Sequence, residues 1–554
     1  MSAFRRHVRW TLPAIAVLVL SVALPSAASG GKASTARVQD KTPAPAVGIA
    51  SSDTATLVEN LPTGGSQSHG TAVFPTNSEA AYKAAKAQAA GALAASNGAK
   101  GPSAPGGPLA PPTLRGRNFA GVNNSQCGCA PPDTHGVVGE SHFLETSNSH
   151  IDIYQKGPGN PPPLVYSAPA STFWSTGHFP CDQRTIYDAT FKRYIVIGIS
   201  CDNTTTHNVL FIAASVTSNP VAGGFYVYNN INGPWAFCDY PELGQTQDAI
   251  TITCDNFALG GSWQNSQFFG IAKARIFNGL GFGAPVFTVG NGTLTPSNAY
   301  SADQTNSAYY IAGGFHCGGC GTGGVIPTYR AQDLANPSQT SAFFLGNVSI
   351  PQYSIAGNAP CGNNGAANCI DTLDARFVNA TTLVGNSLYA IHAPAVPTGS
   401  GFSGLGYYRI DLPSLTAPDY VRTFSSSTSY DFNPSLAATG DNNGNVYLTF
   451  TSVCNVTCAN GGNQANPEVR VSGRQDGVDA GGPNTTNINM PGTLLRISPS
   501  QYQGGRWGDY SAVSADPQNY TAEGCGVGQR AWIVNEWDSS VNFWETHIAR
   551  IGYC

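Results

Sequence analysis

The residues most suited to chemistry gather around Asp133 and Asp182. His135 follows Asp133 by two positions, and Arg184 and Tyr187 follow Asp182 in the stretch CDQRTIYD. A histidine beside an arginine and a tyrosine can transfer a proton, and an arginine can bind the carboxylate of an acidic sugar. We therefore predict His135, Asp133, Arg184 and Tyr187 as catalytic residues. The alternative is that they are loop residues with structural hydrogen bonds.

Three aspartates and one tryptophan are predicted to bind a substrate. Asp182, Asp239 and Asp509 each stand before a stretch typical of a strand, and Trp507 precedes the last of them in RWGDYS. An exposed indole ring is a flat surface on which a sugar can stack, so we expect Trp507 to be exposed. The motifs of serine hydrolases, zinc proteases and phosphate-binding loops are missing from the sequence, and no carboxylate pair is singled out for a glycosidase.

An aspartate followed by a strand-like run recurs along the chain, and this repeat predicts the fold. Its seven occurrences are Asp133, Asp182, Asp239, Asp303, Asp371, Asp431 and Asp509. A four-stranded propeller blade needs roughly 40 to 50 residues, and more with long loops. We therefore predict an all-β chain that forms a seven-bladed β-propeller over residues 116–554. Six blades with one false repeat is the alternative.

The repeated aspartates are expected to lie just before the innermost strands, and so to converge on one rim of the channel. Converging carboxylates repel one another unless a cation or turn amides satisfy them. A Ca²⁺ ion suits hard oxygen ligands, and it is the cofactor we expect if there is one. The alternative is that each aspartate accepts hydrogen bonds within its own turn. We assign no residue as a metal ligand.

The N-terminal residues predict export from the cytoplasm. Arg5, Arg6 and Arg9 precede an apolar run from Leu12 to Leu24, and small residues follow it, so residues 1–28 read as a signal peptide. No later stretch is long and apolar enough to span a membrane. The formal net charge of −5 offers no basic surface for nucleic acid. We expect a secreted monomer.

Residues 29–115 read as a leader without a core of its own. Alanine, glycine, serine and proline dominate it, and GPSAPGGPLAPP (101–112) is typical of a linker. A short helix is predicted in AAYKAAKAQAAGALAAS, after a capping box at Thr76 and Glu79. We expect a flexible spacer whose removal leaves the propeller stable; a propeptide or a cell-wall tether is the alternative. Residues 118–122 are expected to complete the last blade.

The 14 cysteines fit an exported chain held by disulfides. Spacing alone does not fix their connectivity, but several pairs flank predicted hairpins or loops. The candidate pairs are Cys181 with Cys201, Cys238 with Cys254, Cys361 with Cys369, Cys454 with Cys458, Cys525 with Cys554, Cys317 with Cys320, and Cys127 with Cys129.

Three stretches resemble a group of secreted bacterial propeller proteins described as sialidase-like or BNR-repeat-like. They are PPDTHGVVGESHF (131–143), YDATFKRY (187–194) and RWGDYSAVSADP (506–517). The resemblance covers most of residues 116–554 and implies the propeller fold. True sialidases begin with F-R-I-P and carry S-x-D-x-G-x-x-W Asp boxes. This chain has neither, so the resemblance implies architecture and no particular reaction.

Together these patterns predict a secreted propeller that engages an extracellular polysaccharide or glycoconjugate. The sequence leaves open whether it is an enzyme; if it is, we expect a carbohydrate-active hydrolase or lyase. The alternative is a non-catalytic propeller that binds a partner at the cell surface or in the matrix. A deep pocket with acidic, aromatic and arginine side chains would favour carbohydrate chemistry, and a flat apolar patch would favour a protein partner.

Overall fold

The computed structural model describes residues 42–63, 80–95, 111–299, 305–317, 324–361, 367–396, 398–426, 428–439, 444–454, 465–475, 492–503 and 506–554. The predicted signal peptide lies outside these residues. Strands dominate the described chain, which confirms the expected all-β class. Its helices include none that is both long and apolar enough to cross a bilayer.

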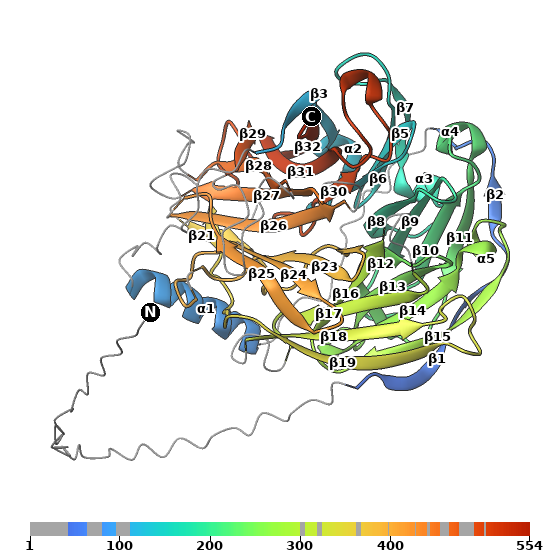
Figure 1. Ribbon diagram of the computed structural model, residues 1–554, viewed down its shortest axis with the longest axis horizontal. Helices are drawn as coiled ribbons and strands as arrows, with labels where there is room; N and C mark the ends of the chain where they lie inside the picture. The colour runs from blue at the N-terminus through green and yellow to red at the C-terminus, as the bar shows by residue number, and fades with distance from the viewer. Residues whose placement is uncertain are drawn as a thin grey trace, which may run out of the picture. The chain divides into compact units, whose positions relative to one another are not determined.

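Most described strands fall into seven antiparallel units of four (Figure 1). Each unit is named here by its innermost strand. The first four are the β4 unit, β4 (His135–Val138), β5 (His142–Ser147), β6 (His150–Gln155) and β7 (Leu164–Pro169); the β8 unit, β8 (Pro180–Asp188), β9 (Arg193–Ser200), β10 (Leu210–Ser215) and β11 (Phe225–Ile231); the β12 unit, β12 (Phe237–Gln245), β13 (Ala249–Phe257), β14 (Trp263–Ala272) and β15 (Phe282–Val289); and the β16 unit, β16 (Thr293–Ala299), β17 (Ser307–Gly313), β18 (Val325–Gln332) and β19 (Ser341–Ser349).

The remaining three units follow in chain order, except for one strand. They are the β22 unit, β22 (Thr381–Val384), β23 (Ser387–His392), β24 (Leu405–Asp411) and β25 (Thr416–Thr423); the β26 unit, β26 (Ser429–Ala438), β27 (Val446–Cys454), β28 (Pro467–Arg474) and β29 (Thr493–Ile497); and the β30 unit, β30 (Ala512–Ala515), β31 (Arg530–Ser540), β32 (Phe543–Gly552) and β3 (Thr113–Asn123). Three of the seven units are joined through the parallel pairs β12–β16 and β16–β22 into one sheet of thirteen strands, which also contains β1 (Ala44–Ser52). The short elements are β20 (Ala359–Cys361), β21 (Ala367–Ile370), α2 (Asn124–Cys127), α3 (Ala170–Phe173), α4 (Pro220–Gly223), α5 (Lys273–Ile276) and a 3-10 turn at Thr521–Glu523.

The core lies in layers between neighbouring units because the side chains of each strand alternate between two faces. In β9, Val196 packs with Leu144 and Phe211 toward the β4 unit. The neighbouring residues Ile195 and Ile197 point the other way, into a cluster shared with the β12 unit. Strands such as β9 are therefore buried on both faces, which explains their runs of β-branched residues.

Each innermost strand is tied to the next, and the series returns to its start. The ties, in order, are His135 Nδ1 with the Thr185 amide, Asp182 with the Tyr240 amide, Gln245 with Asn298, the strand pair Ser297 and Thr381, Thr382 with the Ala438 amide, Ser435 with the Val513 amide, and Ser514 with the Val138 amide. The last of these joins the final unit to the first.

The N-terminal side of the chain completes the last unit, as the sequence predicts. Strand β3 pairs antiparallel with β32, and Asn118 lies opposite Ala549 (Figure 1). Because β3 precedes every other strand of the units, its pairing joins the two ends of the strand series. Residues 118–120 pair with β32, as expected for a strand that completes the last unit.

The leader is more than a spacer, which corrects the interpretation of residues 29–115. Strand β1 (Ala44–Ser52) pairs with β15, and β2 (Thr56–Val58) pairs with β11, so each adds a fifth strand to a unit. Ala50 is fully buried in the core, where it lies opposite Ala284 of β15. The predicted helix is present as α1 (Ala80–Ala95), but Thr76 and its capping box lie outside the described residues. Pairing with partners more than 150 residues away left no local signal in the leader sequence.

We expect Ala50→Asp to lower the melting temperature by several degrees, because it places an unpaired carboxylate in the core beneath β1. Ser51→Asp is the matched control, since the neighbouring side chain is exposed. Differential scanning calorimetry of both variants measures the effect. Equal melting temperatures for the two variants would show that β1 contributes nothing, as a spacer would.

Three of the repeated aspartates sit in or beside irregularities of the innermost strands. The register of β8, β12 and β26 shifts next to Asp182, Asp239 and Asp431. Asp182 itself has a φ of 51°, a left-handed conformation that aspartate tolerates better than most residues. Asp303 does not fit the repeat, because it follows β16 in the chain instead of preceding an innermost strand, and it lies outside the described residues.

The described disulfides agree with the predicted pairs. They are Cys127–Cys129, Cys181–Cys201, Cys238–Cys254, Cys361–Cys369 and Cys525–Cys554. Cys320 and Cys458, the expected partners of Cys317 and Cys454, lie outside the described residues.

Candidate functional site

Charged and tyrosine side chains converge where the innermost strands begin. We call this set the charged cluster: Asp133, Asp182, Asp239, Asp371, Asp374, Asp509, Arg184, Arg376, Arg506, Tyr240 and Tyr510. Its members come from strands β8 and β12 and from the segments before β4, β22 and β30. Most of the cluster is buried, but the side chain of Arg506 is 39% exposed and that of Asp371 28%. Solvent therefore reaches the cluster from one side.

Arg184 lies across the start of the innermost strands and is held from several directions. Its guanidinium donates to Glu242 Oε1 at 2.6 Å, to Asn379 Oδ1 at 3.0 Å, and to the carbonyls of Pro241 and Val378. It also stacks on Tyr510, 3.4 Å from the ring centroid. The side chain is 1% exposed, and four of its five N–H groups donate hydrogen bonds to acceptors of the protein. This geometry does not leave Arg184 free to bind a substrate carboxylate.

The other two arginines of the cluster are also paired. Arg376 binds both carboxylate oxygens of Asp374, at 2.7 and 3.1 Å, and lies over the ring of Tyr240. Arg506 donates to Asp509 Oδ2 at 2.5 Å. Of the three arginines, Arg506 is the most exposed, and it is the one that a ligand can reach.

The aspartates of the cluster connect one unit to the next. Asp133 accepts from the Asp509 amide at 2.7 Å and from Asn148 Nδ2 at 2.6 Å. Asn148 in turn accepts from the Asp182 amide, and Asp182 accepts from the Tyr240 amide. These hydrogen bonds cross unit boundaries, whereas Asp431 accepts from Ser425 and Ser429 of its own turn. The structure thus places Asp133, Asp182 and Asp509 together, in contacts that also stabilise the fold.

Burial and mutual repulsion raise the pKa values of several carboxyl groups in the cluster. Burial, with help from Asp509 and Asp182, raises the pKa of Asp133 to about 8. Burial and Asp239 raise the pKa of Asp182 to about 8, and burial and Asp255 raise that of Asp239 to about 7. These groups keep a proton near neutral pH, as general acids in enzyme sites do.

Asp239 differs from the other aspartates with raised pKa values in its surroundings. Its backbone is in the irregular part of β12, and the residue is partly exposed, whereas Asp133 and Asp182 are buried. Its Oδ1 atom is buried and has no hydrogen-bond partner. A protonated carboxyl group with an unpaired oxygen can donate a proton to a ligand that comes into contact with it.

His135 is held as a neutral ring. Its Nδ1 lies 3.2 Å from the Thr185 amide, which can only donate, so Nδ1 accepts and the ring proton is on Nε2. Burial and the neighbouring Arg184 lower the pKa of His135 well below its usual value. In this arrangement His135 can donate a hydrogen bond, and it has no free nitrogen with which to remove a proton. Its catalytic role stays a prediction.

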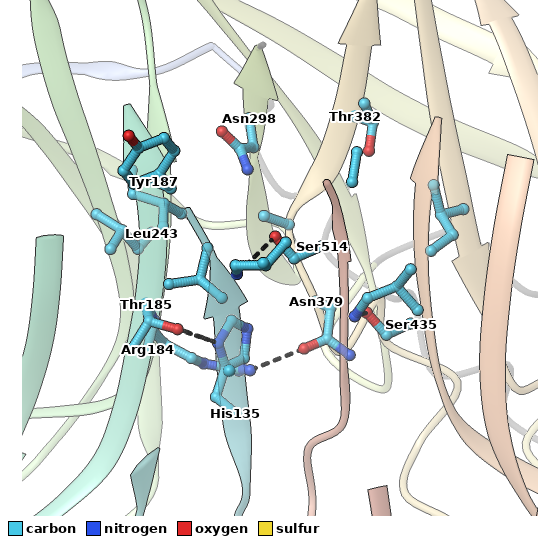
Figure 2. A pocket seen from close by; sticks show the side chains of 18 of the residues that line it. His135, Arg184, Thr185, Tyr187, Leu243, Asn298, Asn379, Thr382, Ser435 and Ser514 are labelled. Atoms are coloured by element: carbon cyan, nitrogen blue, oxygen red, sulfur yellow. Dashed lines mark hydrogen bonds between the residues drawn. The ribbon is translucent and has the colours of Figure 1, made fainter. Parts of the chain in front are cut away.

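A cavity continues from the cluster along the innermost strands of all seven units (Figure 2). His135 and Arg184 lie at one end of it, and Tyr187 lies toward the other end, three residues further along β8. The structure therefore does not bring Tyr187 beside His135. The cavity has about 50 Å³ of space for solvent, enough for a few water molecules but not for a sugar ring.

Trp507 contradicts its prediction, because it is buried. Its side chain is 1% exposed and packs edge-on against Tyr502 in a core cluster with Tyr430 and Phe432. Burial of this large apolar ring between units stabilises the fold. A sugar platform at this position is therefore wrong.

Sequence reasoning missed several members of the cluster. Tyr240 and Tyr510 pack 5.0 Å apart, although 270 positions separate them in the chain. The signal that could have found them is the pair Asp-Tyr, which occurs in CDYPELG and again in GDYSAVS. Arg506 is the first residue of the motif RWGDYS, but the motif itself does not indicate a role for it.

The expected Ca²⁺ ion stays a prediction. The carboxylates of the cluster are held by arginines and backbone amides. Over the part of the chain that the structure describes, no group of three or more His, Cys, Asp or Glu side chains is placed to hold a metal ion.

Comparison with known proteins does not assign the chain to a family. No family model matches it, and no curated protein matches its sequence. Among solved structures, an ACO/RPE65 chimera is 10% identical, covers 61% of this chain and 68% of its own, and superposes with a TM-score of 0.35. The Hadza microbial sialidase Hz136 is 10% identical over 76% of this chain and 65% of its own, with a TM-score of 0.33. A subtype N10 neuraminidase-like protein of A/little yellow-shouldered bat/Guatemala/060/2010 is 8% identical over 62% of this chain and 94% of its own, with a TM-score of 0.32. We therefore infer function from the charged cluster itself.

Proposed function

We propose that this chain is a secreted, monomeric seven-bladed β-propeller that binds an extracellular glycan at the charged cluster. The seven four-stranded units are its blades, and the unbroken series of ties between innermost strands supports seven blades over six. Loops from several blades meet at the cluster, where a ligand would contact them together. The paired cysteines are consistent with export to an oxidising environment.

The observation that carries this proposal is the group of carboxyls with raised pKa values beside paired arginines. Such groups gather at sites of acid–base chemistry more often than elsewhere. Asp239 is the proton donor that we propose for a hydrolase or lyase reaction, because its pKa is raised to about 7 and its Oδ1 atom has no hydrogen-bond partner. Arg506 and Asp371 offer hydrogen bonds to the hydroxyl groups of a sugar on the exposed side of the cluster.

The non-catalytic alternative has one observation in its favour. Helix α1 lies against the loop at Asp371–Leu373, so the exposed side of the cluster is partly covered. A binding propeller needs no proton donor, and its cluster would serve recognition alone. The two functions are separated by whether a bound glycan is cleaved.

The test is a screen of the full chain against a panel of polysaccharides, with and without a chelator. Reducing ends and absorbance from unsaturated uronates are both followed. We expect product from at least one glycan, and a loss of about 100-fold or more in turnover for Asp239→Asn, the loss typical of a missing general acid. Asp411→Asn is the control, because Asp411 lies in an exposed turn with Ser414.

Binding without product would support the non-catalytic propeller. Product that is unchanged in Asp239→Asn would show that another group donates the proton. If no glycan is either bound or cleaved, the proposed function is wrong. A melting temperature that falls when the chelator is added would support the expected calcium ion.

A further inference from the structure

We propose that Asp371, Thr372 and the Leu373 carbonyl form a binding site for a primary ammonium group, which Lys86 of α1 fills in this structure. When α1 leaves, this site takes the ammonium group of an amino sugar. The proposal rests on the proposed function for its natural ligand, but the ammonium site itself does not depend on it.

The contacts of Lys86 are those of a built site. Its Nζ lies 3.0 Å from Asp371 Oδ1, 3.1 Å from Thr372 Oγ1 and 2.6 Å from the Leu373 carbonyl. A lysine ammonium has three N–H groups, so each one has an acceptor. The Lys86 side chain is only 10% exposed. Burying a charge so completely is costly unless it is paired in this way.

The site continues into the charged cluster. Leu373 packs with Tyr240 and Tyr510, and both tyrosine rings lie close to the Arg184 guanidinium. Although burial raises it, the pKa of Asp371 is held below its usual value by Lys86 and Arg506. A ligand whose ammonium group replaced that of Lys86 would therefore lie near Arg506 and beside the tyrosines of the cluster.

The helix that carries Lys86 is held mainly by polar contacts. Ten of the sixteen residues of α1 are alanine, and over residues 80–92 its buried side chains are those of Tyr82 and Lys86. Tyr82 donates to both oxygens of Asp371 at 3.2 Å and packs edge-on against Phe315. A helix with so little apolar surface gains little from burial, so a ligand with a similar charge can displace it.

The charge of Asp371 selects a cationic ligand at this site. The pKa of Asp371 lies below its usual value, so its carboxylate is ionised, and each arginine of the cluster already has a carboxylate partner. An anionic sugar would have to displace those partners, whereas an amino sugar restores the positive charge that Asp371 loses when Lys86 leaves. The class of ligand is therefore a glycan with free amino groups, of which glucosamine oligomers are the simplest.

Chemical rescue of Lys86→Ala in the full chain tests the ammonium site. The deleted atoms correspond to n-propylammonium, and n-propanol is the neutral molecule of the same shape. We expect the variant to melt at a lower temperature, n-propylammonium to restore at least half of the loss, and n-propanol to restore none. Lys83→Ala is the matched control, because Lys83 is exposed on the same helix.

A second variant tests whether the carboxylate of Asp371 binds the added ammonium group. Lys86→Ala combined with Asp371→Asn should lose the rescue, because the carboxylate that receives the ammonium is gone. Equal rescue by n-propanol, or no rescue by either compound, would overturn the ammonium site.

Titration calorimetry then tests the class of ligand. We expect Lys86→Ala to bind a glucosamine tetramer at least ten times more tightly than the wild-type chain does, with no such gain for an N-acetylglucosamine tetramer. Rescue by n-propylammonium without binding of the tetramer would confirm the site and exclude amino sugars as its ligand. Binding of both tetramers with equal affinity would support the proposed function and overturn the preference for an ammonium group.

Discussion

Replacing Arg184 by methionine should lower the free energy of unfolding by about 3 to 5 kcal/mol, the usual cost of breaking a buried ion pair by removing one partner. The change leaves the Glu242 carboxylate, the Asn379 amide oxygen and two backbone carbonyls without a donor. It also removes the cation that stacks on Tyr510. Urea unfolding at neutral pH measures the difference.

Two further variants separate the pairing from the loss of bulk. Arg193→Met, on the neighbouring strand, removes an exposed guanidinium that donates only to its own turn, and should change stability little. Arg184→Met combined with Glu242→Gln should be more stable than the single variant, because no unpaired carboxylate is left. A cost below about 1 kcal/mol for Arg184→Met, within the range of exposed ion pairs, would show that Arg184 does not hold the charged cluster together.

The stability of the protein should fall as the pH rises from about 5 to about 8. In the unfolded chain an aspartate loses its proton near pH 4, but Asp133 and Asp182 in the folded protein keep theirs until about pH 8 and Asp239 until about pH 7. Between these values the folded state binds more protons, so raising the pH favours unfolding. Each such group contributes about 1.4 kcal/mol per pH unit.

Asp182→Asn should remove part of this slope. The amide oxygen of asparagine can still accept from the Tyr240 amide, and the side chain cannot ionise. We expect the variant to match the wild type at pH 5 and to exceed its stability at pH 8. In Asp411→Asn, which changes an exposed carboxylate, the slope should be that of the wild type. Stability that is flat or that rises over this range would mean that the carboxyls are already ionised in the folded protein.

Much of the fold could be predicted because its signals are local or repeated. The strand class follows from alternating β-branched runs such as YIVIGIS, and the closing strand from the one missing in the last unit. The strands β1 and β2 could not be predicted. Strand β1 is rich in alanine and β2 is only three residues long, and each forms because it pairs with the edge strand β15 or β11. Tertiary context of this kind overrides propensity.

The site was predicted only in part, for a related reason. Asp133, Asp182, Asp239 and Asp509 do converge, because the repeat places each of them near the start of an innermost strand. Arg506 and Lys86 could not be assigned, since their partners come from distant segments. The prediction that Trp507 is exposed was wrong because an aromatic residue in a polar motif can also fill a core. Nothing in the neighbouring sequence distinguishes an exposed ring from a buried one.

The most direct test of the charged cluster as the functional site is hydrogen exchange on Lys86→Ala with and without a glucosamine tetramer. We predict slower exchange in residues 371–378 and 506–511, and no change near Tyr187 at the other end of the cavity. Protection confined to the outer strands, such as β7 or β19, would place the ligand on the edge of the units and contradict the account.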